Sequence, residues 1–383
     1  MLDLLDGVRV VDLTTIILGP YGTQILGDLG ADVVKVETPS GDLLRYARPG
    51  RSDDLGATFL GFNRNKRSIT LDLKSDAGRD ALDRLLASAD VLVHNMRPAA
   101  AERLGLGLDE VSERHPHLVY VRSPGFDQDG PDKDRPAYDD VVQAASGFAG
   151  LMAGPAGGEP QYVPSVVCDK VGGLHLAIAV LAGLVNKERN GGAGRRIEAP
   201  MFESIVSFLL SEHLSGHSFE PPLGPVGYAR VVDPGRRPYR TADGFLGVLP
   251  YDTGHWQRML RLLGRDDLAE ARWVAEPVER AGRVGELYQA LADGLPARTT
   301  AEWVAAINEA DIPCSPVAHP ADLLDDEHLE TVGMFPVVDH PTEGRIRQVR
   351  SPFRDRDGHE PRPDRPAPGL GEHDDEVLGP LRP

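Results

Sequence analysis

Asp169 is a carboxylate in a setting that suits covalent chemistry. It lies in the segment VVCDKVGG, just before a helical pattern over residues 170–188. One interpretation makes it the N-cap of that helix, accepting backbone N–H hydrogen bonds. The other makes it a nucleophile for an activated acyl group, with Gly172 and Gly173 allowing close approach. The helix terminus would keep the carboxylate ionised but blunt its nucleophilicity, so the spacing leaves both interpretations open.

Cations gather in two places along the chain. The segment NRNKRSITLDLK, residues 63–74, carries Arg64, Lys66, Arg67 and Lys74. Arg97 and Arg103 follow a later strand-like run, near the expected carboxyl ends of strands, where ligands bind in open α/β sheets. In a chain with this excess of acids the clustered cations indicate a polyanionic ligand. The alternative is an ordinary solvated charged face.

Other kinds of site are less well supported. His213 and His217 have i,i+4 spacing, but no HExxH pattern accompanies them, so no metal site is expected. Residues 19–37 resemble a dinucleotide-binding fingerprint without its G-x-G-x-x-G spacing. A nicotinamide oxidoreductase therefore ranks last among the alternatives. No G-x-S-x-G nucleophile elbow occurs.

Composition narrows the partners and the compartment. The 383 residues include 41 Lys+Arg and 59 Asp+Glu, for a formal net charge of −18. Such a charge opposes binding to nucleic acid and to anionic membranes. Two cysteines, Cys168 and Cys314, cannot form a disulfide framework, which favours the cytoplasm. The longest apolar stretch, residues 172–185, is too short to span a bilayer and predicts a buried helix.

Short β-branched runs alternate with helical patterns in the first half of the chain. Strands are expected over residues 8–13, 32–37, 68–73, 90–94 and 118–122. Their near-continuous apolar character is typical of parallel strands covered on both faces. The pattern predicts an α/β fold with a doubly wound, mostly parallel sheet.

Composition also suggests a division of the chain. Residues 1–219 are expected to form a large domain, and the Pro/Gly-rich residues 220–238 a linker. Residues 239–330, with a strand pair around the turn TADG and three helical patterns, predict a smaller domain. Residues 331–383 begin with strand-like alternation. They end in a tail rich in Pro, Asp and Arg that should be poorly ordered unless it docks on the body.

As a set, several segments resemble the class III CoA-transferases, the CaiB/BaiF family. The similarity begins with LDGVRVVDLTTIILGPYGTQILGDLGADVVKVETPSGD and continues through FNRNKRSITLDLK and DVLVHNMRPAAAERLGLG. It resumes at RPAYDDVVQAASG, VVCDKVGGLHLAIAVLAGLV, PYRTADGFLGV and PGLGEHDDEVL. The segments follow the order of the family and cover most of the chain.

The resemblance implies a particular architecture. A large Rossmann-like, CoA-binding domain would be built from both ends of the chain, with a smaller α+β domain inserted between them. Two ring-shaped subunits would interlock into a homodimer. Residues 331–383 would then return to the large domain.

The resemblance also implies a chemistry. Asp169 matches the catalytic aspartate, which would form a mixed anhydride and then an aspartyl-CoA thioester on the way from donor to acceptor. The family's CoA-contacting stretches fall on Leu71, Lys74, Asn95, Arg97 and Arg103. Coenzyme A and acyl-CoA would be substrates alongside a small carboxylic acid, with no tightly bound cofactor.

Tyr138 falls at an active-site position that separates the branches of the family. Acyl-CoA racemases carry a histidine there, whereas a tyrosine, with an ordinary pKa of about 10, is a poor proton shuttle. CoA transfer is therefore favoured over racemisation. A formyl or oxalyl substrate is not favoured, because Ile17 replaces a polar residue and the family's glycine-rich covering loop has no counterpart. An acyl-CoA racemase and a silent CoA-binding protein remain alternatives.

Overall fold

The computed structural model describes residues 1–154, 157–360 and 362–381 and divides the chain into two compact units. The first unit comprises Met1–Ala149, Tyr162–Leu209 and Thr331–Pro383. The second unit comprises Gly150–Gln161 and Leu210–Glu330. Both ends of the chain thus belong to the first unit. The segment 220–238, expected as a linker, groups with the second.

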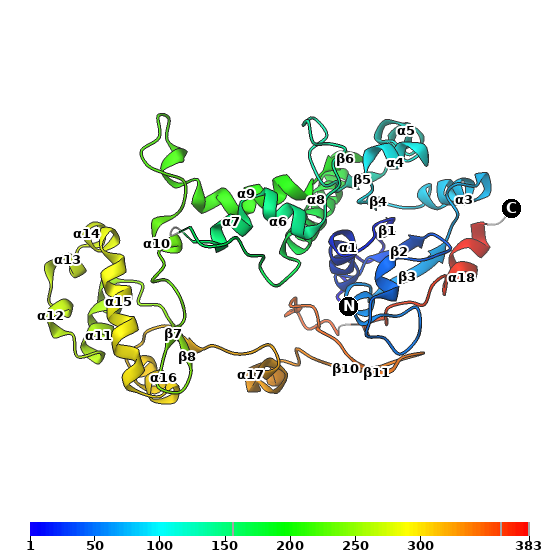
Figure 1. The fold of residues 1–383 in the computed structure, drawn as a ribbon. Coiled ribbons are helices and arrows are strands. Elements are labelled where there is room, and N and C mark those ends of the chain that lie inside the picture. Colours follow the sequence, from blue (N-terminus) through cyan, green and yellow to red (C-terminus); the bar gives the residue numbers. More distant parts are fainter. Residues whose placement is uncertain (155–156, 361, 382–383) are drawn as a thin grey trace. The chain divides into compact units, whose positions relative to one another are not determined.

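A six-stranded parallel sheet forms the centre of the first unit, as predicted (Figure 1). Its order is β3-β2-β1-β4-β5-β6. The strands are β1 (Arg9–Asp12), β2 (Asp32–Glu37), β3 (Lys66–Thr70), β4 (Val91–His94), β5 (Val119–Arg122) and β6 (Arg195–Glu198). The chain winds outward from β1 to β3, then crosses to β4 and winds outward to β6. The winding direction therefore reverses between β1 and β4, the type of position where open α/β sheets bind ligands.

Helices cover both faces of this sheet, because successive strand residues point to opposite sides. Val10, Val33 and Val91 pack under α1 (Leu18–Asp28), α6 (Asp139–Ala145), α8 (Val167–Arg189) and the start of α9 (Met201–His213). Val11 and Val34 pack on the other face. The helices there are α3 (Asp76–Leu86), α4 (Pro98–Arg103), α5 (Leu108–Arg114) and α18 (Asp374–Leu378).

The end of the tail docks on β3, the edge strand (Figure 1). The backbone N–H of His373 donates to the carbonyl of Ser68 at 2.9 Å. The Asp374 carboxylate accepts the backbone N–H of Thr70 at 2.7 Å. Docking thus orders a segment whose composition alone favoured disorder. The unit is completed by α2 (Ala57–Phe62) and the antiparallel pair β10 (Val337–His340) and β11 (Gly344–Arg347).

Helix α8 is longer than the apolar stretch in the sequence suggested. At 23 residues, with a mean hydropathy of 1.6 in its most apolar window, it has the length and composition of a membrane span. However, half of that window is buried inside the protein, against α1, β5 and β6. The core helix of a globular protein meets the same criteria, so length and hydropathy alone are weak evidence that α8 spans a membrane.

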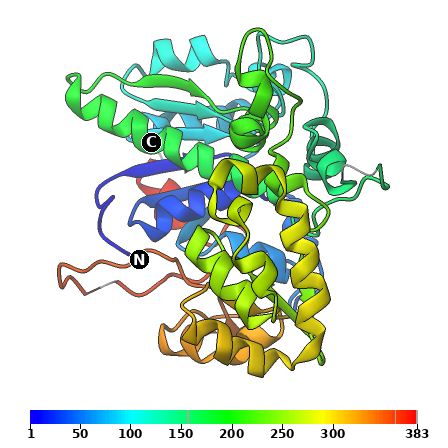
Figure 2. The same ribbon diagram turned by 90° about the vertical axis from the view of Figure 1, so that its left-hand side faces the viewer.

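The second unit is mainly helical (Figure 2). It also contains a small antiparallel sheet. Its sheet has the order β7-β8-β9, from β7 (Tyr239–Arg240), β8 (Phe245–Val248) and β9 (Cys314–Pro316). Its principal helices are α11 (Thr253–Leu262), α15 (Val284–Gly294) and α16 (Thr300–Glu309). Shorter helices are α10 (Ala229–Val232), α12 (Asp266–Ala269), α13 (Arg272–Ala275) and α14 (Pro277–Gly282). Trp256, Leu287 and Trp303 are central to its apolar core. Helices α7 (Phe148–Met152) and α17 (Glu327–Thr331) lie where the two units divide.

Candidate active site

A cavity of about 260 Å³ lies in the first unit at the point where the winding of the sheet reverses. Its walls come from the segments that follow β1, β4 and β5, from the start of α6 and from α8 and α9. They are Thr15, Ile16, Leu18, Asn95, Arg97, Ser123, Pro124, Gly125, Arg135, Pro136, Ala137, Tyr138, Asp169 and Met201. Four of the predicted site residues, Asn95, Arg97, Tyr138 and Asp169, therefore meet in one place.

Asp169 is the third residue of α8 and does not cap it. The helix begins at Val167, and the cap is a side chain from a different helix. The Asp139 carboxylate accepts the backbone N–H groups of Cys168 at 2.7 Å and Asp169 at 3.1 Å. Within the described part of the chain, no hydrogen bond reaches the Asp169 carboxylate, which is 9% exposed. The N-cap interpretation of Asp169 is therefore wrong.

The charge state of Asp169 also differs from the expectation. Burial, followed by the negative charges of Asp139 and Asp140, raises the pKa of Asp169 to about 7. The sequence suggested that the helix terminus would hold this carboxylate ionised. Instead, the Asp139 carboxylate occupies the N–H groups at that terminus and adds a like charge. A less stabilised carboxylate is a stronger nucleophile when it is ionised.

Gly172 and Gly173 serve helix packing, not approach of a substrate. A Cβ on Gly173 would lie 2.5 Å from the Leu18 carbonyl oxygen, and one on Gly172 would lie 2.6 Å from the Leu18 side chain. On the facing helix, a Cβ on Gly22 would lie 2.6 Å from the Gly173 carbonyl oxygen. The glycines let α1 and α8 approach closely, and this contact places Asp169 beside the start of α1.

Asn95 ties the loop after β1 to the loop after β4. Its side-chain oxygen accepts the backbone N–H of Thr15 at 3.0 Å, and its side-chain nitrogen donates to the Thr15 carbonyl at 2.9 Å. Ile16, which follows Thr15 in the chain, has a backbone φ of +68°. A β-branched residue in this conformation is strained by about 1–3 kcal/mol. The two loops therefore form one wall that includes a strained residue.

The remaining predicted CoA contacts lie outside the cavity. The Leu71 side chain is buried in the apolar core, whereas Lys74 and Arg103 are exposed. Leu71 directly follows β3, two strands from β1 in the sheet, or about 10 Å along the same carboxyl edge. These residues could meet only a ligand that extends along that edge.

Three of the cations in the strand-like segment 63–74 are not available to a ligand. Arg64 pairs with Asp28, Lys66 with Asp12 at 3.2 Å, and Arg67 with Asp32 at 2.6 Å. All three cations are buried. These three cations therefore do not form the expected phosphate-binding cluster, because each is neutralised by an acid. The sequence pattern did not reveal these partners, which lie far away along the chain.

Two residues of the site were missed in the sequence. Asp139 follows Tyr138 directly, yet only the fold shows that it caps the helix bearing Asp169. Arg135 lines the cavity, pairs with Asp132 at 3.3 Å and lies over the Phe126 ring at 5.5 Å. Its position three residues before Tyr138 is the sequence feature that could have indicated its place in the site.

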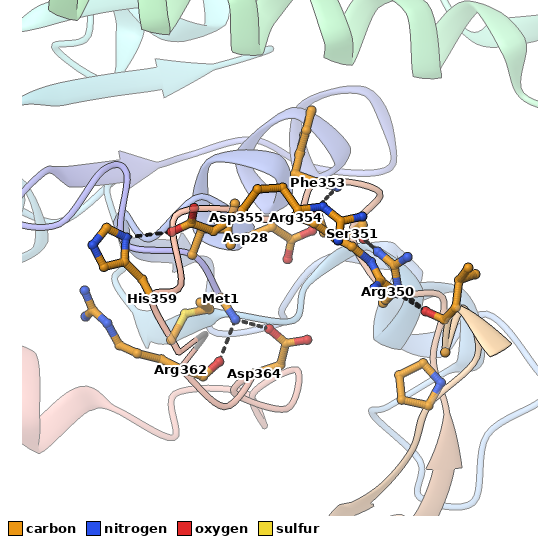
Figure 3. Close-up of a pocket in the computed structure, with 15 residues that line it drawn as sticks. Met1, Asp28, Arg350, Ser351, Phe353, Arg354, Asp355, His359, Arg362 and Asp364 are labelled. Atoms are coloured by element: carbon orange, nitrogen blue, oxygen red, sulfur yellow. Dashed lines mark hydrogen bonds and ion pairs between the residues drawn. The ribbon is translucent and has the colours of Figure 1, made fainter. Parts of the chain in front are cut away.

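A larger cavity of about 470 Å³ in the same unit lacks a comparable reactive group (Figure 3). Its three acids are all engaged: Asp28 with Arg64, Asp364 with the amino terminus and Asp355 with His359. Asp3 lies close enough to Asp355 and His359 for the three to share a metal ion. The 2.7 Å ion pair between His359 and Asp355 explains most of this proximity, so no metal ion is needed to account for it. The smaller cavity, with its unpartnered carboxylate, is the candidate active site.

The fold and the site together define an open α/β protein with a buried carboxylate at the reversal point of its sheet. Comparison with known proteins narrows this class. The sequence profile of CoA-transferase family III matches residues 5–374. The chain therefore belongs to CoA-transferase family III and is an enzyme of the class III CoA-transferase type, as predicted.

Named relatives act on different acids. A probable fatty acyl-CoA transferase of Mycobacterium tuberculosis, Rv3272, is 37% identical over 78% of this chain and 79% of its own length. A formyl-CoA:oxalate CoA-transferase of Streptomyces coelicolor is 31% identical over 97% of this chain and 94% of its own. A succinyl-CoA:mesaconate CoA-transferase of Haloarcula marismortui is 32% identical over 98% and 95%.

Solved structures agree with this assignment. A crystal structure of Rv3272 matches with a TM-score of 0.82 and 33% identity, over 96% of this chain and 97% of that one. A CaiB/BaiF family protein from Brucella suis matches with a TM-score of 0.81 and 28% identity, over 99% of both chains. The mixed α/β fold is thus shared with known class III relatives.

Proposed function

We propose that this enzyme moves CoA from an acyl-CoA donor to a carboxylic acid, with Asp169 as the nucleophile. The observation that carries the proposal is a buried carboxylate without a hydrogen-bond partner among the described residues, lining a cavity with Asn95, Arg97 and Tyr138. Such a carboxylate can attack a thioester carbonyl once the cavity holds one. Retaining the thioester energy requires that water be excluded, which a buried site favours.

The reaction would proceed in four balanced steps. An Asp169 oxygen attacks the donor thioester, the C–S bond breaks, and CoA thiolate leaves behind a mixed anhydride. The thiolate attacks the aspartyl carbonyl and expels the donor's carboxylate, giving an aspartyl-CoA thioester. The acceptor carboxylate attacks this thioester to form a second anhydride and thiolate. The thiolate then attacks the acceptor's carbonyl, releasing the new thioester and the Asp169 carboxylate.

Charge near the cavity would assist these steps. Helix α1 begins at Leu18, a residue of the cavity wall, and no side chain of the described residues caps it. Its positive end would stabilise negative charge that develops on the attacked carbonyl. The Tyr138 side chain is 64% exposed, and its hydroxyl would orient an acyl or anhydride oxygen. Arg97 is exposed at the N-cap of α4 and would meet a CoA phosphate.

CoA would lie along the carboxyl edge of the sheet. From the cavity it would pass Asn95 and Arg97, while Leu71, through its backbone, Lys74 and Arg103 would contact its more distant parts. CoA is long enough for both sets of contacts, because β3 lies only about 10 Å from β1. This accounts for predicted contacts that do not line the cavity.

The cavity wall favours an acyl group with apolar carbon atoms. Ile16, Leu18 and Met201 line it beside Asp169. Among the relatives, a fatty acyl or succinyl-type substrate fits such a wall better than a formyl group does. By resemblance to the family, we further propose that the enzyme works as an interlocked homodimer in the cytoplasm, without a tightly bound cofactor.

Mass spectrometry after incubation with a mixed acyl-CoA pool tests the nucleophile. We expect a CoA adduct on the peptide that contains Asp169, lost on addition of an acceptor acid and absent in Asp169→Ala. Asp140→Asn, which alters a nearby exposed acid, is the matched control and should retain the adduct. Substantial transfer activity in Asp169→Ala would refute the assignment.

Racemisation at the acyl Cα is the second candidate, because a pKa of about 7 suits Asp169 to proton transfer. Exchange on both faces of Cα needs a second proton carrier, and the other titratable residues of the cavity wall are Arg97, Arg135 and Tyr138. Deuterium uptake at Cα from heavy water, without any acceptor acid, would favour this reaction. Acyl-CoA binding with neither exchange nor an adduct would indicate a silent CoA-binding protein.

A further inference from the structure

Ile16 adopts a backbone conformation that its side chain opposes. Its φ of +68° lies in the left-handed region, which β-branched residues rarely enter. It is also part of the cavity wall, between Thr15 and the start of α1. Strain of this kind persists only where the surrounding structure enforces it, and it concentrates at functional sites.

A buried ion pair enforces the conformation. The Ile16 backbone N–H donates to both Asp42 carboxylate oxygens, at 3.3 and 3.2 Å. Asp42 pairs with the Lys35 ammonium at 3.0 Å, and both side chains are fully buried. The same ammonium donates to the Thr14 carbonyl at 2.8 Å. The pair therefore forms hydrogen bonds with the β1–α1 loop on both sides of Thr15, at Thr14 and at Ile16.

The pair belongs to a different part of the chain from the loop it holds. Lys35 lies on β2, and Asp42 precedes a short 3₁₀ turn whose Leu44 N–H it accepts at 3.0 Å. Glu37, also on β2, accepts the Asp42 N–H at 3.0 Å. Neighbouring contacts thus hold the Asp42 side chain in place, so it can act as a rigid anchor.

General stability does not account for this arrangement. A fully buried ion pair is often no more stabilising than apolar residues of the same size, because both charges lose their hydration. Here the anion also accepts a hydrogen bond from a strained residue of the cavity wall. The free-energy cost of burying the Lys35–Asp42 pair and the backbone strain of Ile16 therefore both fall on the β1–α1 loop.

We propose that Asp42, supported by Lys35, is a positioning residue that holds Ile16 in the left-handed conformation and so fixes the β1–α1 loop opposite Asp169. The idea rests on the proposed function insofar as that loop must face the reacting thioester. If Ile16 relaxed to negative φ, the start of α1 at Leu18 would turn away from the cavity. The proposed phosphate contact of Arg97 would change less, because Arg97 lies at the N-cap of α4, two residues beyond the Asn95 side chain that bonds to Thr15.

The first test separates positioning from general stability. Asp42→Asn keeps the shape of the side chain but removes the charge that strengthens the Ile16 hydrogen bond. We expect kcat for CoA transfer to fall about tenfold, with less than a twofold change in KM for acyl-CoA. Asp32→Asn is the matched control: it weakens the pairs with Arg67 and Arg9 at the opposite end of β2 and should leave kcat unchanged per folded enzyme.

A double-mutant cycle tests the link itself. Glycine enters the left-handed region without strain, so in the Ile16→Gly background there is little for Asp42 to enforce. Asp42→Asn should then reduce kcat less than threefold, against about tenfold in the native background. Equal losses in both backgrounds, or a loss that appears wholly in KM, would overturn the proposal.

Urea unfolding of the same four proteins gives a second readout that needs no turnover. If the link exists, the effects of Asp42→Asn and Ile16→Gly on the free energy of unfolding will be non-additive. Additive effects would overturn it. If the native protein transfers no CoA from any donor, the proposed function fails, and the unfolding cycle still decides whether Asp42 restrains Ile16.

Discussion

The Asp139 carboxylate accepts the backbone N–H of Asp169 at 3.1 Å and also raises the pKa of the Asp169 side chain. One acid thereby anchors the helix that carries Asp169, the proposed nucleophile, and opposes the ionisation of its carboxyl group. Gln143 donates to Asp139 at 2.6 Å, which keeps it in place. The arrangement yields a carboxylate that titrates near neutral pH instead of near pH 4.

Transfer activity should therefore depend on pH around neutrality. Asp169 must be ionised to attack, so kcat/KM should rise as the pH increases through about 7. Asp139→Asn keeps an oxygen to accept the helix N–H groups. It removes the negative charge that, of the two neighbouring acids, contributes more to the raised pKa of Asp169. The acidic limb of the pH–rate profile should move to lower pH, though not as far as pH 4, because burial is the largest cause of the raised pKa.

Asp140→Asn is the control for this shift, since Asp140 contributes less than Asp139 to the raised pKa. It should displace the acidic limb by a smaller amount in the same direction. If Asp139→Asn does not shift the pH–rate profile, then Asp139 does not control the ionisation of Asp169.

Asp169→Asn should abolish transfer and stabilise the fold. The folded pKa of about 7 lies above the ordinary 3.8, so the folded state holds the proton more tightly than the unfolded state. The stability that protonated Asp169 contributes is complete below pH 4 and is lost between about pH 4 and 7. At about 1.4 kcal/mol per pKa unit, removing this penalty should add up to a few kcal/mol at pH 8.

Urea unfolding at pH 8 and pH 4 measures this effect. The native and Asp169→Asn proteins should differ clearly at pH 8 and much less at pH 4. A variant that is less stable than the native protein at pH 8 would contradict the raised pKa.

Gly173→Ala should disturb the contact between α1 and α8. Its Cβ would lie 2.5 Å from the Leu18 carbonyl oxygen, a backbone atom that can move only with its helix. We expect a loss of about 1–3 kcal/mol, the range for overpacked cores, together with reduced turnover. Gly61→Ala on α2 is the control: a Cβ there meets nothing within 4 Å, so stability should be unchanged or higher. Thermal unfolding of both variants tests this, and equal melting temperatures would contradict it.

Arg97→Ala should weaken CoA binding about tenfold, as expected on loss of a charge-assisted contact to phosphate. Arg97 is exposed on the cavity wall, and no carboxylate pairs with it among the described residues. Calorimetry with CoA and with dephospho-CoA would identify the phosphate involved. Arg84→Ala, which removes an exposed cation from α3, should leave both affinities unchanged. Unaltered CoA affinity in Arg97→Ala would assign Arg97 another role.

The sequence by itself determined the type of fold, and it predicted part of the candidate site. Parallel strands that are covered on both faces must be apolar throughout, so the runs that became β1, β2, β4 and β5 were readable as strands. Asp169 and Arg97 were predicted from residue type and position, and Tyr138 and Asn95 by resemblance to the family. The structure gathers all four around one cavity.

Only the tertiary structure decided how charges and glycines are used. Lys66 looks like a ligand-binding cation in the sequence, but its partner Asp12 lies 54 residues away along the chain, on β1, which β2 separates from the Lys66 strand β3. In the sequence, Gly173 suggests space for a substrate, whereas in the structure α1 packs against it. Asp139 caps a helix that begins 28 residues after it. Local patterns reveal burial and periodicity, whereas these pairings depend on which segments the fold brings together, and they decide the ionisation of Asp169 and the shape of its cavity.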